Sequence, residues 1–297
     1  MLRPVVVGMD GSRESLAAAE WAAQEALRRR LPLHLVHAWE GGVTPDLSEL
    51  PELDAPRYWA RRILRDAVER LGERCPQVVP TTEQIARSAP DALVAAGDEA
   101  ELLVLGSRAF SGFGGFMAGS VALATVAHVT RPVVLVRAEQ TLEDEHLPDA
   151  ENHPSAATPY RDVLVGVDPA NACEEVLAFA FGSAMLRAAP LRAVYTWRLP
   201  YVEAAAEARA RRAVGASAAK ALTAVMRPWR EKFPTVDVHE LTPEGSAPLR
   251  LTDAAKGAGL LVVGRRIRPA RLGTHTGPVA HAVMHHARCP VAVVPHQ

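Results

Sequence analysis

Residues 102–137 read LLVLG, SRAFSGFGGFMA, GSVALATVAHV and TRPVVLVR in succession. The first segment is a short apolar run that ends at Gly106, and a glycine-rich loop follows it. The third segment opens on Gly119-Ser120 and has the composition of a helix, and the fourth contains a second apolar run. The stretch therefore predicts a buried strand, a loop, a helix and another buried strand, the unit from which parallel sheets are built.

The same order returns at residues 260–295, which read LLVVG, RRIRPARLGTHT, GPVAHAVMHHA and RCPVAVVP. A constant spacing of this kind indicates duplication of one domain. We predict two tandem doubly wound α/β domains at 1–138 and 160–297, joined by an acidic linker at 139–159. Five pairs of landmarks keep the same separation of 158 positions: Asp10 and Asp168, Trp39 and Trp197, Gly106 and Gly264, Gly119 and Gly277, and Pro132 and Pro290.

The first domain also shows its elements in order. Ser12 stands where the N-cap of a helix is expected, and the sequence SLAAAEWAAQEALRRR that it opens is strongly helix-forming. The remaining predictions are strands at 5–7, 33–39 and 78–85, helices at 56–74 and 90–96, and a loop or flap at 40–55.

The composition limits the classes of function. The 297 residues carry a net charge of −1, which gives no broad attraction to nucleic acid or anionic membranes. No apolar run approaches the ~20 residues that span a bilayer. Cys75, Cys173 and Cys289 form no CxxC pair, so we expect a reducing cytoplasm and neither a disulfide framework nor a cysteine metal site.

Ligands of parallel α/β sheets bind beyond the carboxyl ends of the strands. Gly8-Met9-Asp10, Ala38 and Gly106 all lie at such ends. The helix that starts at Gly119-Ser120 offers backbone N–H groups, a hydroxyl and the positive end of its dipole, which suit a phosphate. The Asp10 carboxylate is better suited to accept hydrogen bonds from a base or ribose. Neither the Walker A pattern nor GxGxxG is present.

The pattern resembles the universal stress protein family in its tandem form, over essentially the whole chain. The resemblance rests on VVVGMDGS, LHLVHAW, GSRAFSGFGGFMAGSVA and PVVLVR. ATP-binding members carry a glycine, two residues, a second glycine, nine residues and Gly-Ser. Gly106 and Gly119-Ser120 match this pattern, whereas Ala109 stands at the second glycine.

The resemblance implies five parallel strands per domain, dimerisation through the final strand and a role in the stress response. It also implies bound ATP, with or without Mg²⁺, in the first domain. The implied binding residues are Gly8, Met9, Asp10, Ala38, Gly106, Arg108, Ala109, Gly119, Ser120, Val121 and Ala122.

Two departures from the family pattern set further expectations. If position 109 takes a positive φ, Ala109 weakens ATP binding by about ten- to thirtyfold. In the second domain Ile267 replaces the second glycine and Pro278 replaces the serine. Ile267 would then block the phosphate path, and we expect a site that binds ATP weakly or not at all. The four arginines of this loop offer an alternative, which is an anion bound by side chains: Arg265, Arg266, Arg268 and Arg271.

Three functions remain open. The first is an ATP-binding sensor or regulator that changes conformation or protein partner, and the second is a nucleotide-free scaffold. The third is a weak ATPase, for which no catalytic residue can be assigned. His281 and His285 have helical spacing for a metal, but no third ligand is evident and we predict none. We expect the two domains to pair as an internal pseudo-dimer through 132–136 and 290–294, with further association of two chains.

Overall fold

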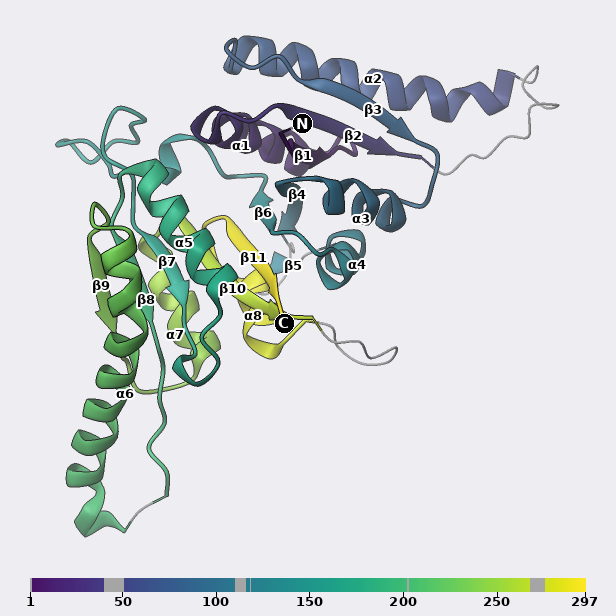
Figure 1. Cartoon of the computed structure of the whole chain (residues 1–297). Helices are drawn as coiled ribbons and strands as arrows, with labels where there is room; N and C mark the ends of the chain where they lie inside the picture. Colours follow the sequence, from purple (N-terminus) through teal and green to yellow (C-terminus); the bar gives the residue numbers. More distant parts are fainter. Residues whose placement is uncertain (1, 40–50, 110–115, 118, 202, 268–275) are drawn as a thin grey trace. The chain divides into compact units, whose positions relative to one another are not determined.

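The computed structural model describes residues 2–39, 51–109, 116–117, 119–201, 203–267 and 276–297 (Figure 1). The chain divides into two compact units, Met1–Thr141 and Leu142–Gln297. Each unit is a parallel sheet with helices on both faces, as the alternating pattern predicted. No helix in these described ranges has the length and apolar character needed to cross a membrane.

The first unit has five parallel strands in the order β3-β2-β1-β4-β6 among its described residues. The short β5 (Phe116–Met117) pairs antiparallel with the end of β4. The strands are β1 (Val5–Gly8), β2 (Leu33–Ala38), β3 (Thr81–Ile85), β4 (Leu102–Ala109) and β6 (Val133–Arg137), and the helices are α1 (Arg13–Arg29), α2 (Pro51–Arg74), α3 (Ala89–Glu99) and α4 (Ser120–His128).

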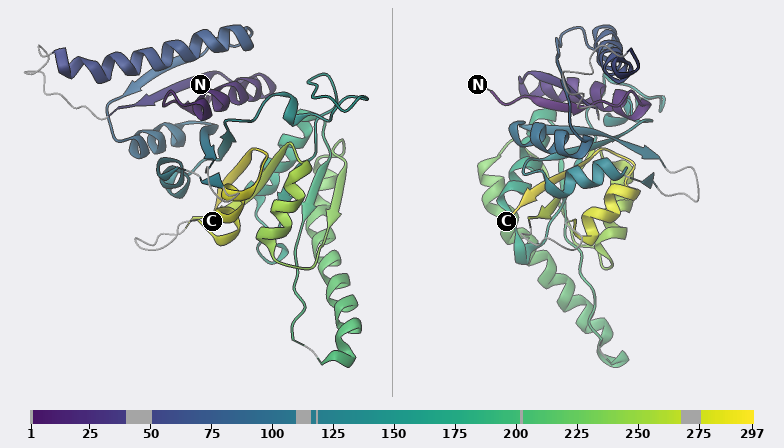
Figure 2. Two further views of the ribbon diagram at one scale, coloured as in Figure 1. Left: turned by 180° about the vertical axis from the view of Figure 1, so that it is seen from behind. Right: turned by 90° about the vertical axis from the view of Figure 1, so that its right-hand side faces the viewer.

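The central strands of this unit are buried on both faces. α1 and α2 cover one face of the sheet, and α3 and α4 cover the other (Figure 2). For this reason the strands are continuous apolar runs instead of alternating patterns, and Leu102, Leu103 and Val104 are fully buried. Ser12 caps α1 by accepting a hydrogen bond from Ser15 N at 3.2 Å.

The second unit repeats this design, with its five described parallel strands in the order β11-β10-β7-β8-β9. α5 and α6 lie on one face of the sheet, and α7 and α8 on the other. The strands are β7 (Val163–Gly166), β8 (Leu191–Val194), β9 (Val238–Leu241), β10 (Leu260–Arg266) and β11 (Val291–His296); the helices are α5 (Glu174–Arg187), α6 (Ala204–Lys232), α7 (Ala247–Ala254) and α8 (Pro278–His286), with 3₁₀ turns η2 (Glu143–Glu145), η3 (Pro169–Asn171) and η4 (Ala255–Gly257).

Two predicted boundaries in the first unit were wrong. α2 begins at Pro51 and not at residue 56, because proline is compatible with the first turn of a helix. β3 begins at Thr81 and not at residue 78, and Val79 is exposed. Of the expected loop at 40–55, residues 51–55 are helical, and residues 40–50 lie outside the described part of the chain.

The expected linker at 139–159 is partly folded onto the second unit. Glu145 is 1% exposed and lies 3.9 Å from the buried Arg187. The Glu145 carbonyl accepts a hydrogen bond from Arg161 N at 2.8 Å, and His146 forms a β-bridge with Tyr160. A buried arginine therefore neutralises one carboxylate of this acidic segment. The second compact unit therefore starts at Leu142.

Candidate functional site

A cavity of about 260 Å³ lies in the first unit at the carboxyl ends of β1, β2 and β4, beside the start of α4. The structure brings nine of the predicted binding residues together around it. They come from three strand ends and one helix start, which is where a parallel sheet gathers its ligand contacts. The nine are Gly8, Met9, Asp10, Ala38, Gly106, Gly119, Ser120, Val121 and Ala122.

The side chains of Arg108 and Ala109 lie outside the described part of the structure, which gives only their backbone. Both belong to the end of β4, where Arg108 pairs with Met117 and Ala109 with Phe116. A paired strand residue has an extended backbone with negative φ. The condition under which Ala109 would be strained is therefore not met. The glycines of the loop itself, Gly112, Gly114 and Gly115, lie outside the described residues.

Gly106 and Gly119, the two motif glycines that the structure describes, differ in whether the fold requires a glycine at their position. A Cβ on Gly106 would lie 2.5 Å from the carbonyl carbon of Glu14 and 2.7 Å from Ser15 N, so this glycine lets α1 pack on the end of β4. A Cβ on Gly119 would meet no described atom within 4 Å. Gly119 has φ −59° and ψ 157°, which any residue can adopt. The fold needs a glycine at 106, but among the described contacts nothing requires one at 119.

The start of α4 is open toward the cavity. Gly119 is its N-cap, and no side chain of the described residues caps the helix. The first backbone N–H groups of a helix have no partner within the helix, and they carry the positive end of its dipole. The cavity-lining residues Ser120, Val121 and Ala122 form this first turn. An anionic group in the cavity would be stabilised here.

Asp10 also lines the cavity, and hydrogen bonds to Ser12 fix its local geometry. Its Oδ1 accepts a hydrogen bond from Ser12 N at 2.9 Å and another from the Ser12 hydroxyl. Gly11 makes this tight turn possible, since its φ is +79°. The exposed carboxylate is thus held at the cavity mouth, where it can accept further hydrogen bonds.

His37, next to Ala38 at the end of β2, also lines the cavity. Its Nδ1 lies 2.7 Å from the Met9 carbonyl oxygen, so Nδ1 carries the donated proton. This bond ties the end of β2 to the segment that follows β1. In the sequence, the position of His37 next to Ala38 at the end of a predicted strand indicates that it lies near the ligand site. The other described residues of the lining, which were not among the predicted binding residues, are Ser12, Glu14, Ser15, Val36, His37, Ala89, Leu93 and Leu105.

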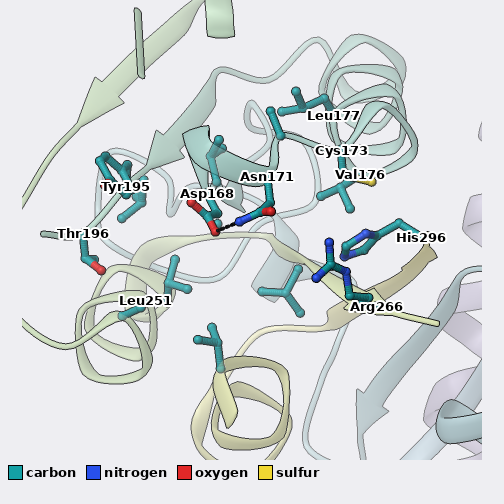
Figure 3. A pocket seen from close by; sticks show the side chains of 18 residues that line it. Asp168, Asn171, Cys173, Val176, Leu177, Tyr195, Thr196, Leu251, Arg266 and His296 are labelled. Atoms are coloured by element: carbon teal, nitrogen blue, oxygen red, sulfur yellow. Dashed lines mark hydrogen bonds between the residues drawn. The ribbon is translucent and has the colours of Figure 1, made fainter. Parts of the chain in front are cut away.

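The second unit has a larger cavity, of about 490 Å³, at the matching strand ends (Figure 3). Gly264 and Val279 line it, but Ile267 does not. Ile267 is 40% exposed, has no positive φ, and its N–H donates to the His296 carbonyl at 2.6 Å. The expectation that Ile267 blocks the site was therefore wrong.

Pro278 still changes the helix start in the second unit. α8 begins at Pro278 with Gly277 as its N-cap, and proline has no N–H to offer an anion. Of the four arginines expected near this site, Arg266 lines the cavity and Arg265 is buried. Arg268 and Arg271 lie outside the described residues.

Neither cavity gathers a metal-ligand set from the described residues. His281 and His285 have ring centroids 4.4 Å apart on α8, without a third ligand in the described part of the chain. The described group with suitable spacing is Asp149, Glu151 and His153. Asp149 Oδ1 accepts hydrogen bonds from the backbone N–H groups of the other two, which is an ordinary turn.

A sequence model of the universal stress protein family matches residues 1–137 and 159–295. The chain belongs to the universal stress protein family. Both repeats are matched, so this is a tandem member, as the resemblance implied.

Known universal stress proteins align with nearly the full chain. Universal stress protein Rv2005c of Mycobacterium tuberculosis is 31% identical over 97% of this chain and 96% of its own. Universal stress protein Rv2623 of the same species is 29% identical, over 97% and 95%. A universal stress protein structure from Archaeoglobus fulgidus has a TM-score of 0.69 at 14% identity, covering 99% of this chain and 98% of its own, and supports the fold.

Proposed function

We propose that the cavity of the first unit binds an adenine nucleotide, with ATP as the ligand, and that the protein acts as a stress-response sensor or regulator. The observation that carries this proposal is that the start of α4 and the Asp10 carboxylate line one cavity. A nucleotide needs both ends: a donor group for its phosphates and an acceptor for its ribose hydroxyls or base.

The residues present fit a nucleotide. A Cβ at Gly119 would meet no atom of the described residues within 4 Å, so among these residues a phosphate can approach the backbone N–H groups at the first turn of α4 closely. Ser120 adds a hydroxyl donor. The carboxylates of Asp10 and Glu14 also border the cavity and would repel phosphates, so Asp10 serves the nucleoside end. The volume of about 260 Å³ is near the lower end for ligand sites, roughly 300 Å³.

Binding would act on the protein through the segments that the nucleotide joins. The cavity is bordered by three strand ends and the α4 start, and His37 already ties two of these segments together. A ligand that bridges them stabilises one arrangement of these segments over others. Bound Mg²⁺ would come with the phosphates, since this cation is commonly held through them. The protein partner would then bind the nucleotide-bound arrangement of these segments.

Calorimetry with ATP, ADP, AMP and GTP tests the proposal on the full chain. We expect one adenine nucleotide per first unit and weaker binding of GTP. At ATP a hundredfold above its dissociation constant, the folded first unit gains about 2.7 kcal/mol, which raises its melting temperature by roughly 8 °C. The variant Ser120→Ala should bind ATP more weakly, while Ser155→Ala, in an exposed turn of the second unit, is the matched control.

Two other functions are outcomes of the same experiments. No heat and no melting shift with any nucleotide would favour a scaffold that acts only through protein contacts. Conversion of ATP to ADP in single-turnover assays with excess protein, lost in Ser120→Ala, would favour an ATPase.

We also propose a cytoplasmic location and self-association. The three free cysteines suit a reducing compartment, and light scattering on the purified chain tests the association state.

A further inference from the structure

The second unit begins its first helix differently from the first unit. Gly11 has φ +79°, and its counterpart 158 positions later is Pro169, whose ring fixes φ near −65°. The turn of the first unit cannot form there. Instead residues Pro169–Asn171 form the 3₁₀ turn η3, capped by Asp168, which accepts from Ala170 N at 3.1 Å.

Because η3 replaces the tight turn, the first helix of the second unit starts later, and its backbone does not take the place beside Gly264 that the start of α1 has beside Gly106. α1 begins at Arg13, whereas α5 begins at Glu174, which corresponds to position 16 of the first unit. In the first unit the backbone of Glu14 and Ser15 packs against Gly106. At Gly264 the nearest atoms to an added Cβ are instead His296 Nε2 at 2.9 Å and Cδ2 at 3.0 Å. The His296 imidazole thus takes the place of the helix start, and the cavity is larger.

Arg266 and His296 form one corner of this cavity, here called the cationic corner after the charged guanidinium of Arg266. They are register partners on β11 and β10, at the carboxyl ends of the strands. Figure 3 shows both side chains on one side of the cavity, across from Asp168 and Tyr195. Among the described residues no carboxylate forms an ion pair with either side chain, and His296 Nε2 has no hydrogen-bond partner. The first unit has no such pair, because Ala138 stands at the position of His296.

The rest of the cavity is suited to an apolar body. Val176, Leu177 and Leu251 are at most 5% exposed, and they line the cavity between the cationic corner and the polar side. The nearby carboxylate of Glu175 accepts a hydrogen bond from the Cys173 thiol at 2.9 Å. On the polar side, Asp168 is held by Asn171 Nδ2 at 2.9 Å. The side chains therefore present one cationic end, an apolar middle and a hydrogen-bonding end.

We propose that the second cavity binds a small organic anion with an apolar or aromatic body, whose carboxylate or phosphate contacts Arg266 and His296. This site uses side chains and not the N-terminus of α8, where Pro278 has removed an N–H. It therefore differs in chemistry from the nucleotide site proposed for the first unit and does not depend on it. A volume of about 490 Å³ lies within the usual range for small-molecule sites.

The test compares a charged probe with its neutral analogue by calorimetry on the full chain. The probes are indole-3-acetate and indole-3-acetamide, which share an aromatic body and differ in the carboxylate. We expect the acetate to bind at least tenfold more tightly than the amide. Arg266→Gln and His296→Gln should each weaken acetate binding about tenfold. Arg227→Gln, an exposed arginine on α6 outside the cavity, should leave it unchanged.

Titration with AMP is the second part of the test. It distinguishes a phosphate from a carboxylate as the anionic group that contacts Arg266. AMP binding that is lost in Arg266→Gln would identify a nucleoside phosphate as the ligand of this corner. AMP binding lost only in Gly119→Val would assign AMP to the first cavity and leave the carboxylate as the ligand of the second. The proposal is overturned if neither the acetate nor AMP shows binding that depends on Arg266, in variants that melt at the wild-type temperature.

Discussion

Two glycines of one motif, Gly106 and Gly119, should respond to substitution in opposite ways. Both belong to the pattern that marks nucleotide-binding members of the family. At Gly106 the space for a Cβ is filled by backbone of α1, whereas at Gly119 no described atom lies within 4 Å. Gly106→Ala should therefore damage the fold, and Gly119→Val should damage ligand binding with little effect on the fold.

The cost of Gly106→Ala follows from the atoms that the new methyl group would meet. The carbonyl carbon of Glu14 at 2.5 Å and Ser15 N at 2.7 Å are backbone atoms, so no side-chain rotation can relieve the contact. α1 must shift as a whole. Overpacking of this kind costs about 1–3 kcal/mol. In a unit of this size the melting temperature should fall by roughly 3–9 °C.

Gly119→Val should cost about 0.5 kcal/mol in stability, which is the loss expected when a poorer N-cap replaces glycine. Its side chain would enter the space beside the first turn of α4. A phosphate could then no longer approach the backbone N–H groups of Ser120 and Val121. Loss of hydrogen bonds to a charged group costs about 1.5–3 kcal/mol, so ATP affinity should fall by roughly ten- to a hundredfold.

The assay is thermal melting together with ATP titration on wild type and both variants. A wild-type melting temperature for Gly106→Ala would refute the packing role of Gly106. Unchanged ATP affinity in Gly119→Val would refute the nucleotide position at the start of α4. Large destabilisation by Gly119→Val would show that the fold, and not a ligand, requires glycine there.

Three further predictions concern other parts of the chain. Ala109→Gly should not raise ATP affinity, because β4 holds this residue in an extended backbone; a tenfold gain in calorimetry would contradict this. Glu145→Gln should destabilise the second unit by about 3–5 kcal/mol in urea unfolding, since it leaves the Arg187 charge buried, while the exposed Glu151→Gln should have no effect. Burial and the bond to Glu175 raise the pKa of the Cys173 thiol to about 11, so its alkylation by iodoacetamide should be slow at pH 8 and rise about tenfold per pH unit up to that pKa; a plateau near pH 8.5 would contradict it.

Much of the fold could be predicted because apolar runs and glycines mark strand ends directly. The run at 102–106 could only be a strand buried on both faces, and the constant spacing of 158 positions carried that assignment to the second unit. The cavity of the first unit followed, since the carboxyl ends of neighbouring parallel strands meet at one edge. The position of His37 at a strand end does not reveal its hydrogen bond to the Met9 carbonyl, which crosses between strands.

The remaining features depend on contacts between distant residues. The backbone at Ala109 is set by pairing with Phe116, which the spacing of the glycines does not reveal. The burial of Glu145 in the acidic segment between the domains depends on Arg187, forty-two positions away in the sequence. The cationic corner arises because Pro169 rebuilds a turn, which leaves space for His296 from the far end of the unit. Residue type alone gives none of these distances.

The central claim is that the first cavity holds an adenine nucleotide. The most direct measurement is the nucleotide released when the purified full chain is denatured, identified by chromatography and mass spectrometry, after incubation with ATP and removal of free ligand. We predict about one adenine nucleotide per chain from the wild type and close to none from Gly119→Val. No nucleotide from the wild type, or equal amounts from both proteins, would contradict the account.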